Sequence, residues 1–140
     1  MFNFGDMELS SKILYEQSKD GSLRSSLTSD AKNKISKYRS LVEKALNSGE
    51  TYYGINTGFG YLANVRIADE KLDVLQVNLV RSHACGTGEY VEKEISRALL
   101  FLRAHTFALG HTGISLACVD KILQLLENDV LPAVPAVLSL

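Results

Sequence analysis

Three glycines within seven positions distinguish the stretch that most constrains the fold of this chain, Tyr53-Gly54-Ile55-Asn56-Thr57-Gly58-Phe59-Gly60. Glycine costs about 1 kcal/mol relative to alanine inside a helix. It is favoured where the backbone takes a positive φ or passes close to a ligand. We therefore predict a non-helical loop in which at least one glycine has a positive φ.

Polar side chains inside this stretch are expected to shape the loop. Asn56 and Thr57 can form side-chain and backbone hydrogen bonds there, and Gly54, Gly58 and Gly60 provide conformational freedom. Phosphate-binding loops also use glycine, but no Lys-Ser/Thr pair follows these glycines and no strand is predicted before them. We therefore expect no nucleotide site here.

Apolar residues recur at spacings of three and four on both sides of the loop, which is the pattern of amphipathic helices. The pattern predicts about five helices, over residues 7–19, 29–48, 70–84, 91–109 and 113–128. The expected start signals are Asp6, Thr28 or Ser29, and Asp69, and the expected stop signals are Gly21, Gly49 and Gly110. Pro132 and Pro135 prevent the last helix from continuing. No segment alternates convincingly as a strand, so the predicted fold class is all-α, a single domain over residues 1–140.

The same spacing predicts which face of each later helix is buried. The third helix is expected to bury Leu72, Leu75, Leu79 and His83. The fourth is expected to bury Ile95, Ala98, Leu99, Leu102 and Thr106. The fifth is expected to bury Ile114, Cys118, Ile122 and Leu125.

Composition excludes several classes of partner. The chain has 140 residues, 46% of them hydrophobic and 22% charged, which is typical of a globular domain. Its 15 basic and 16 acidic residues form no basic stripe, so we expect no nucleic-acid partner. No apolar run has the length of a membrane helix, so we expect no membrane partner. The first residues lack the features of a signal peptide, and two cysteines suit a reducing compartment, so the expected location is the cytoplasm.

No metal site is predicted. The available nitrogen and sulfur ligands are His83, Cys85, His105, His111 and Cys118. No pair of them has C-x-x-C or H-x-x-x-H spacing, and ligands two residues apart on a helix point away from each other.

The octapeptide at 53–60 resembles the signature loop of the aromatic amino acid ammonia-lyases, especially histidine ammonia-lyase. Residues 78–88, 97–113 and 128–135 are similar to three further blocks of that family. The resemblance covers about residues 30–137 and weakens toward the C-terminus, where His105 and Thr112 replace the usual Asn and Ser. It implies the helical N-terminal portion of an ammonia-lyase-like fold.

The resemblance gives Tyr53 a catalytic role, as the base that removes a β-proton from the amino acid substrate. A phenol in water has a pKa of about 10, so this role requires surroundings that favour the phenolate. The alternative is that Tyr53 is a half-buried aromatic residue that anchors the loop.

Ser82 and His83 match the pair found in histidine ammonia-lyases, where relatives specific for phenylalanine or tyrosine carry Phe-Leu or His-Leu. The implied role is substrate binding, because one imidazole can donate a hydrogen bond to another or accept one from it. The alternative is that His83 is an ordinary core residue of its helix.

Family members need no external cofactor, because they form the electrophilic group methylidene-imidazolone (MIO) from their own Ala-Ser-Gly tripeptide. This sequence contains no Ala-Ser-Gly, and by register the tripeptide would fall just after Leu140. The expectation is an N-terminal portion truncated before the tripeptide, and inactive as an isolated chain.

Three functions remain open. The first is the N-terminal part of a histidine ammonia-lyase, a carbon–nitrogen lyase that converts L-histidine to urocanate and ammonia in histidine catabolism, within a family of homotetramers. The second is a non-catalytic helical module that associates with a complementary C-terminal fragment or with full-length subunits. The third is a lyase or aminomutase for another aromatic amino acid.

Overall fold

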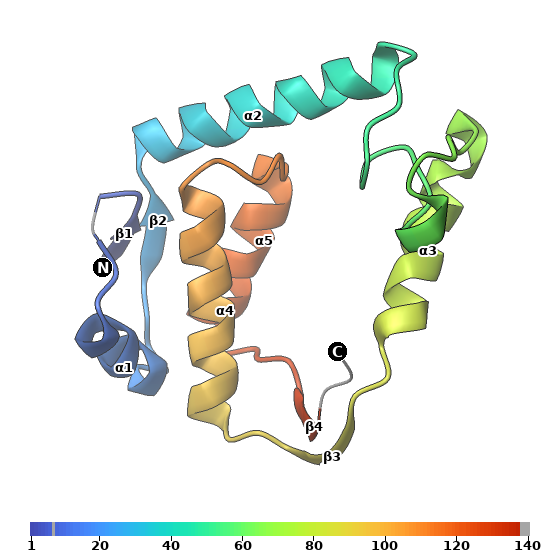
Figure 1. The fold of residues 1–140 in the computed structure, drawn as a ribbon. Helices are drawn as coiled ribbons and strands as arrows, with labels where there is room; N and C mark the ends of the chain where they lie inside the picture. The colour runs from blue at the N-terminus through green and yellow to red at the C-terminus, as the bar shows by residue number, and fades with distance from the viewer. Residues whose placement is uncertain (7, 138–140) are drawn as a thin grey trace. The chain divides into compact units, whose positions relative to one another are not determined.

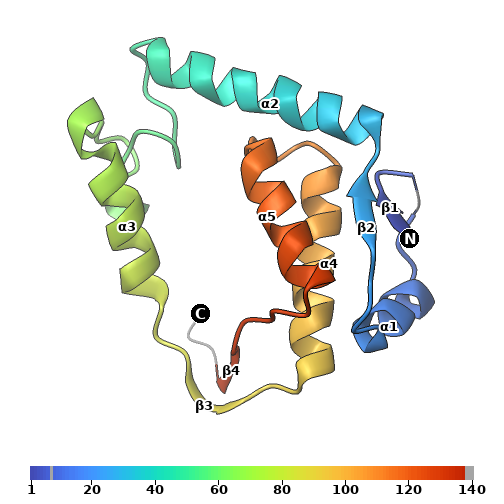
Figure 2. The same cartoon turned by 180° about the vertical axis from the view of Figure 1, so that it is seen from behind.

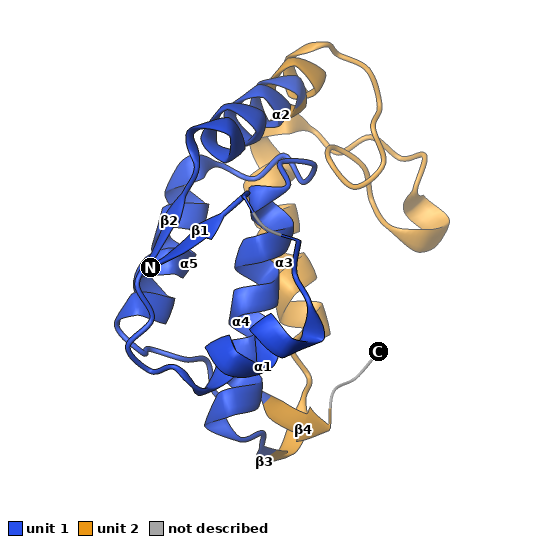
Figure 3. Ribbon diagram, turned by 90° about the vertical axis from the view of Figure 1, so that its left-hand side faces the viewer, with its two compact units in different colours: residues 1–41, 90–134 blue, residues 42–89, 135–140 orange. Residues whose placement is uncertain are grey.

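The computed structural model describes residues 1–6 and 8–137, and the chain forms two compact units. Unit 1 combines residues 1–41 with 90–134, and unit 2 combines residues 42–89 with the segment that follows Val134 (Figure 3). Helix α2 (Ser29–Asn47) crosses the division, which falls after Leu41.

Unit 1 is built around helix α4 (Lys93–Ala108). Helices α1 (Ser11–Lys19) and α5 (Leu116–Glu127) both pack against it, and two opposite views show α4 and α5 side by side (Figures 1 and 2). A short parallel pair, β1 (Phe2–Phe4) and β2 (Ser25–Leu27), contacts the same two helices.

The core of unit 1 is apolar. Phe4 and Phe101 are fully buried, and their rings lie 4.9 Å apart, with Phe2 at 4.8 and 4.9 Å from them. Aromatic pairs at these separations stabilise a core beyond the area that they bury. The remaining members of the core are Leu23, Leu27, Ala31, Ile35, Ala104, Ala108, Val119, Leu123 and Leu126.

Side-chain caps fix where three of these helices begin. The hydroxyl oxygens of Ser10, Thr28 and Ser115 accept from the backbone N–H groups three residues further on, at 3.2, 3.1 and 3.3 Å. The Thr28 cap confirms one of the two predicted alternatives. The first helix begins at Ser11 rather than near Asp6, and the fifth begins at Leu116 rather than Gly113, because a serine cap lies inside each predicted range. Met7 lies outside the described residues.

The predicted inward face of α4 is wrong, and that of α5 is right only in part. On α4 the buried residues are Ser96, Arg97, Phe101, Ala104 and Ala108, whereas Ile95, Leu99 and Leu102 are exposed. On α5 they are Val119, Leu123 and Leu126, and Cys118 is exposed, although the predicted Ile114 and Ile122 pack half-buried against the core. Both helices carry apolar residues on more than one face, so their spacing does not identify the face that packs.

The four short strands were also not predicted. Besides β1 and β2, the pair β3 (Thr87–Tyr90) and β4 (Pro135–Val137) belongs mostly to unit 2. Each strand has three or four residues, which is too short to show an alternating pattern, and each pairs with a segment distant in the sequence. The predominantly helical fold class is confirmed.

One buried arginine joins three elements of unit 1. The guanidinium of Arg97 donates to Asp129 Oδ1 from Nη2 at 2.5 Å and from Nε at 3.2 Å, and to the carbonyl of Ser18 from Nη1 at 2.5 Å. The Nζ of Lys93 lies 2.5 Å from Asp129 Oδ2. Hydrogen bonds from Lys93 and then Arg97 lower the pKa of Asp129. This network links the ends of α1 and α5 to the start of α4.

Unit 2 contains the end of α2, the glycine-rich loop, and helix α3 (Leu72–His83). Two short 3₁₀ helices, η1 (Gly60–Leu62) and η2 (Asp69–Lys71), precede α3. Asp69 does not cap α3 as predicted, because it begins η2 and α3 starts three residues later; its carboxylate pairs with Arg66 at 3.2 Å. His83 is exposed rather than inward, although Leu72, Leu75 and Leu79 are half-buried. None of the helices in the described part of the chain is long and apolar enough to cross a membrane.

Candidate functional site: the glycine-rich loop and the end of α3

The loop forms a tight turn that presents Tyr53. The backbone N–H groups of Ile55 and Asn56 both donate to the carbonyl of Tyr52, at 3.1 and 3.2 Å. Gly54 takes a φ of 77° inside this turn, a conformation that costs other residues steric strain. Gly60 also has a positive φ, 56°, so the glycine prediction is confirmed, and the loop is non-helical over residues 53–59, with Gly60 beginning η1. The Tyr53 side chain is 65% exposed, and its ring centroid lies 6.1 Å from that of Phe59.

Asn56 closes the turn from inside. Its side chain is fully buried, with Oδ1 accepting from the N–H of Tyr52 and Nδ2 donating to the carbonyl of Glu50, both at 2.7 Å. A buried amide satisfied on both sides holds the backbone more firmly than an exposed one, because opening it leaves polar groups without partners. Residues 50–56 therefore form a hydrogen-bonded ring around one side chain.

A short ladder ties the turn to the segment that follows it. The N–H of Ile67 donates to the carbonyl of Asn56 at 2.9 Å, and the N–H of Gly58 donates to the carbonyl of Val65 at 3.0 Å. Thr57 and Arg66 face each other between these bonds as an antiparallel bridge. A Cβ at Gly58 would lie 2.6 Å from the Cβ of Leu62, so only glycine fits this close approach.

Arg66 fastens this ladder to the residues that leave α2. Its Nη1 donates to the carbonyl oxygens of Gly49 and Glu50, the latter at 3.4 Å, and its Nη2 donates to Asp69 Oδ1 at 3.2 Å. The carbonyl of Glu50 thus accepts from both Arg66 and Asn56. One guanidinium joins the beginning and the end of the loop.

The end of α3 presents an imidazole whose tautomer follows from its contacts. His83 Nδ1 lies 2.8 Å from the carbonyl of Leu79, and a carbonyl can only accept, so we assign the proton to Nδ1. The hydroxyl of Ser82 donates to the same carbonyl at 2.9 Å and lies 3.0 Å from Nδ1. In the neutral ring, Nε2 is then an acceptor.

The predicted site residues fall into two groups within unit 2. Tyr53 contacts Phe59 within the loop, and the hydrogen bonds found for Ser82 and His83 stay inside α3. Among the described residues, no hydrogen bond or ring contact joins Tyr53 to His83. Tyr53 is 65% exposed and His83 is also exposed, so neither side chain is held in a core.

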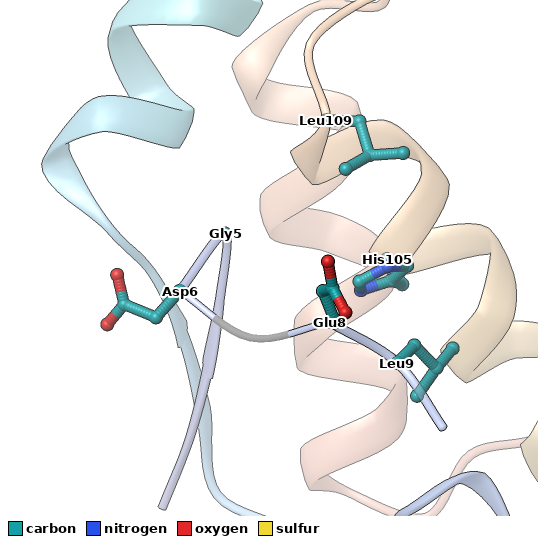
Figure 4. A pocket seen from close by; sticks show the side chains of 6 residues that line it. All are labelled: Gly5, Asp6, Glu8, Leu9, His105 and Leu109. Atoms are coloured by element: carbon teal, nitrogen blue, oxygen red, sulfur yellow. The ribbon is translucent and has the colours of Figure 1, made fainter. Parts of the chain in front are cut away.

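A surface hollow of about 620 Å³ lies elsewhere, in unit 1, and none of these residues lines it. Figure 4 shows the side chains around it, with Glu8 and His105 near its centre and Asp6 pointing away from them. The Nδ1 of His105 is buried there without a hydrogen-bond partner. No group of three His, Cys, Asp or Glu side chains in the described segments could hold a metal ion.

The model of the family described as aromatic amino acid lyase matches residues 10–140. The chain belongs to this family. It is 43% identical over 131 residues to the histidine ammonia-lyase of Shouchella clausii, covering 94% of this chain and 25% of that protein. It therefore spans about a quarter of the length of that relative, and similar or smaller shares of others.

Solved structures of enzymes from several organisms share the fold. The histidine ammonia-lyase of Trypanosoma cruzi superposes with a TM-score of 0.86 at 32% identity, over 96% of this chain and 25% of that one. The tyrosine aminomutase of Streptomyces globisporus superposes with a TM-score of 0.89 at 25% identity, over 99% and 26%. The fold of this chain is thus shared by a histidine ammonia-lyase and a tyrosine aminomutase.

The contacts of Arg66 and Phe59 were not anticipated from the sequence. Phe59 lies within the signature stretch, and its contact with Tyr53 could have been predicted because both aromatic residues belong to the same short loop. Arg66 stands between Val65 and Ile67, a polar residue in a short apolar segment, which suggests a strand-like position. Nothing local shows that its side chain reaches residues 16 and 17 positions earlier.

Proposed function

We propose that this chain supplies the base and a substrate contact of an ammonia-lyase that converts L-histidine to urocanate and ammonia. The observation that carries the proposal is the turn of the family loop, which holds Tyr53 exposed on a backbone fixed by the buried Asn56. A general base must present its oxygen to the substrate from a fixed position, because proton transfer needs hydrogen-bond distance.

The role of Tyr53 is proton abstraction. The phenolate oxygen takes a proton from the β-carbon of the substrate, so that an O–H bond forms as the C–H bond breaks. The electron pair left on the β-carbon forms the double bond of urocanate as the bond between the α-carbon and nitrogen breaks. Tyr53 is 65% exposed, which leaves room for a substrate beside it.

The role of His83 is recognition of the substrate side chain. With its proton on Nδ1, the ring offers Nε2 as an acceptor for an N–H of the substrate imidazole. Ser82 supports this arrangement, since its hydroxyl donates to the carbonyl of Leu79 that also accepts from His83, and it lies next to the imidazole ring. The phenyl ring of phenylalanine has no N–H to donate, so this contact favours histidine.

The residues present do not themselves form the electrophilic group of the family. The 140 residues contain no Ala-Ser-Gly tripeptide, so MIO would come from residues outside this sequence. A general base contributes about 10²–10⁴-fold, well below the roughly 10⁶-fold or more of an enzyme, so we expect the isolated chain to be inactive.

One observation favours the second candidate, an interaction module. Helix α4 exposes Ile95, Leu99 and Leu102 on the face that does not pack in unit 1, and its C-cap residue Leu109 is exposed as well. Exposed apolar groups of this kind are common where another chain or segment binds. This candidate predicts association with a complementary fragment without any effect of Tyr53 on turnover.

The test joins this chain to the C-terminal remainder of one of the histidine ammonia-lyases that it matches, and follows urocanate by its ultraviolet absorbance. Tyr53→Phe should abolish turnover, and Tyr61→Phe, at an exposed position in the same unit, should not. His83→Leu should lower the discrimination for histidine over phenylalanine by about 1–3 kcal/mol.

Turnover by the unjoined chain, or full activity of Tyr53→Phe, would overturn the proposal. An aminomutase would instead yield a β-amino acid.

A further inference from the structure

We propose that Arg66 is a positioning residue for Tyr53, because its guanidinium locks the loop that carries the tyrosine onto the residues that leave α2. The inference rests on the proposed role of Tyr53. Arg66 itself has no role in that proposal and does not contact the tyrosine ring in the contacts described above.

The need for such a lock follows from the length of the loop. Residues 48–68 lie between α2 and η2 and contain only the three-residue helix η1. Loops of this length have many accessible conformations unless contacts of their own restrict them. The buried residues of this loop are Asn56, Thr57 and Gly58, so an apolar core does not hold it. Hydrogen bonds must therefore determine where Tyr53 stands.

Those hydrogen bonds converge on the carbonyl of Glu50. Asn56 Nδ2 reaches it from the Tyr53 turn, and Arg66 Nη1 reaches it from the opposite segment of the ladder. Arg66 also donates to the carbonyl of Gly49 and to the carboxylate of Asp69, so its side chain binds three acceptors, on Gly49, Glu50 and Asp69. Movement of the 65–67 segment would be passed to the turn through the bonds from Ile67 to Asn56 and from Gly58 to Val65.

The chemistry of these anchors calls for arginine. Two carbonyl oxygens and a carboxylate are all acceptors, and guanidinium presents five donors in a planar fork that can serve several of them at once. A lysine has a single ammonium group and cannot span the carbonyls and Asp69 in the same way. Both terminal nitrogens of Arg66 already donate hydrogen bonds within the protein. We therefore infer that Arg66 holds the loop in place and does not bind the substrate carboxylate.

The kinetic test compares Arg66→Met, Arg66→Lys and Arg24→Met in the joined enzyme described above. Methionine keeps much of the apolar stem and removes the donors, and Arg24 is an exposed arginine of unit 1 that serves as the matched control. We expect Arg66→Met to lower kcat by about 10–100-fold with KM changed less than threefold, since misplacement of a reacting group by about 1 Å can cost about 10²-fold. Arg66→Lys should recover part of the loss, and Arg24→Met should match the parent.

One further readout separates positioning from a general loss of folded protein. In the 140-residue chain itself, the amides of Gly58 and Ile67 should exchange at least about tenfold faster in Arg66→Met, because the ladder that they form opens more often.

The outcomes distinguish this inference from the proposed function. If Tyr53→Phe is inactive while Arg66→Met keeps the parental kcat and exchange rates, the positioning role is overturned and the base assignment stands. If Tyr53→Phe is fully active, the proposed function fails, and faster amide exchange in Arg66→Met would then support only the lock on the loop. Should Arg66→Met not fold, Asp69→Ala removes one acceptor of the same clamp, and an unchanged kcat and exchange pattern there would overturn it.

Discussion

Each of the two units is stabilised internally by a different kind of interaction, apolar burial in unit 1 and polar contacts in unit 2. All of the buried apolar residues in the described part of the chain belong to unit 1, where α1, α5 and the β1–β2 pair enclose α4. The buried residues of unit 2 are Asn56, Thr57 and Gly58. A buried leucine contributes about 1.5–3 kcal/mol, whereas a typical hydrogen bond contributes about 0.5–1.5 kcal/mol net.

This difference has a consequence for dynamics and for function. Apolar burial in unit 1 makes its elements interdependent, so they should unfold together. The loop of unit 2 depends on a few polar contacts around Glu50, so it can open locally while unit 1 stays folded. The proposed catalytic tyrosine lies on the less stable region, which explains why a positioning residue would matter there.

The largest effect expected from this comparison is on the core of unit 1. Leu126→Ala should lower the free energy of unfolding by about 2–5 kcal/mol, because Leu126 is fully buried and truncation leaves a cavity. Leu99→Ala, the same change at a helical position that is 46% exposed, should cost less than about 1 kcal/mol. Urea unfolding followed by circular dichroism measures both, and equal costs would show that the buried face of α4 and α5 is misassigned.

An intermediate and strictly local effect is expected in the loop. Asn56→Ala removes two hydrogen bonds and leaves the N–H of the half-buried Tyr52 without its partner, so the opening free energy of the loop should fall by about 1–3 kcal/mol. Amide exchange should accelerate at Tyr52 and Ile67 and stay unchanged in α5. Asn128→Ala is the matched control, since that amide also donates to a carbonyl but is exposed. Equal acceleration throughout unit 1 would contradict the independence of the loop.

The smallest effect is expected from the charge of Asp129 in unit 1. Asparagine keeps an oxygen that can accept from Arg97, and it tolerates the φ of 53° found at this position, so Asp129→Asn isolates the carboxylate charge. The hydrogen bonds from Lys93 and Arg97 lower the pKa of Asp129 in the folded chain. Its contribution is therefore complete above the unfolded value of about 3.9 and is lost as the pH falls through the lower folded value.

The measurement for this prediction is urea unfolding at a series of pH values. The stability difference between the parent chain and Asp129→Asn should be constant near neutral pH and should shrink below about pH 4. Asp120→Asn, at an exposed carboxylate on α5, should give no comparable change. A difference that grows as the pH falls would mean that Asp129 has the opposite linkage.

Much of the local structure could be predicted because its causes lie within a few residues. Thr28 caps α2 through an N–H three positions away, and Gly54 and Gly60 take the positive φ that other residues avoid. The signature octapeptide and the Ser82–His83 pair also indicated the family, which the family model confirms. The roles of Tyr53, Ser82 and His83 remain predictions.

Only the tertiary structure decided which faces are buried and which distant groups meet. Helix α4 is apolar on two sides, and contact with α1 and α5 selects the side of Phe101 over that of Leu102. The β1–β2 pair needs partners more than twenty residues apart, and Arg97 finds Asp129 across thirty-two positions. Arg66 likewise reaches Gly49 only once the loop has folded back on itself. Caps and turns are set by bonds between near neighbours in the chain, whereas packing faces and long-range polar contacts depend on the cooperative burial of segments that sequence spacing does not relate.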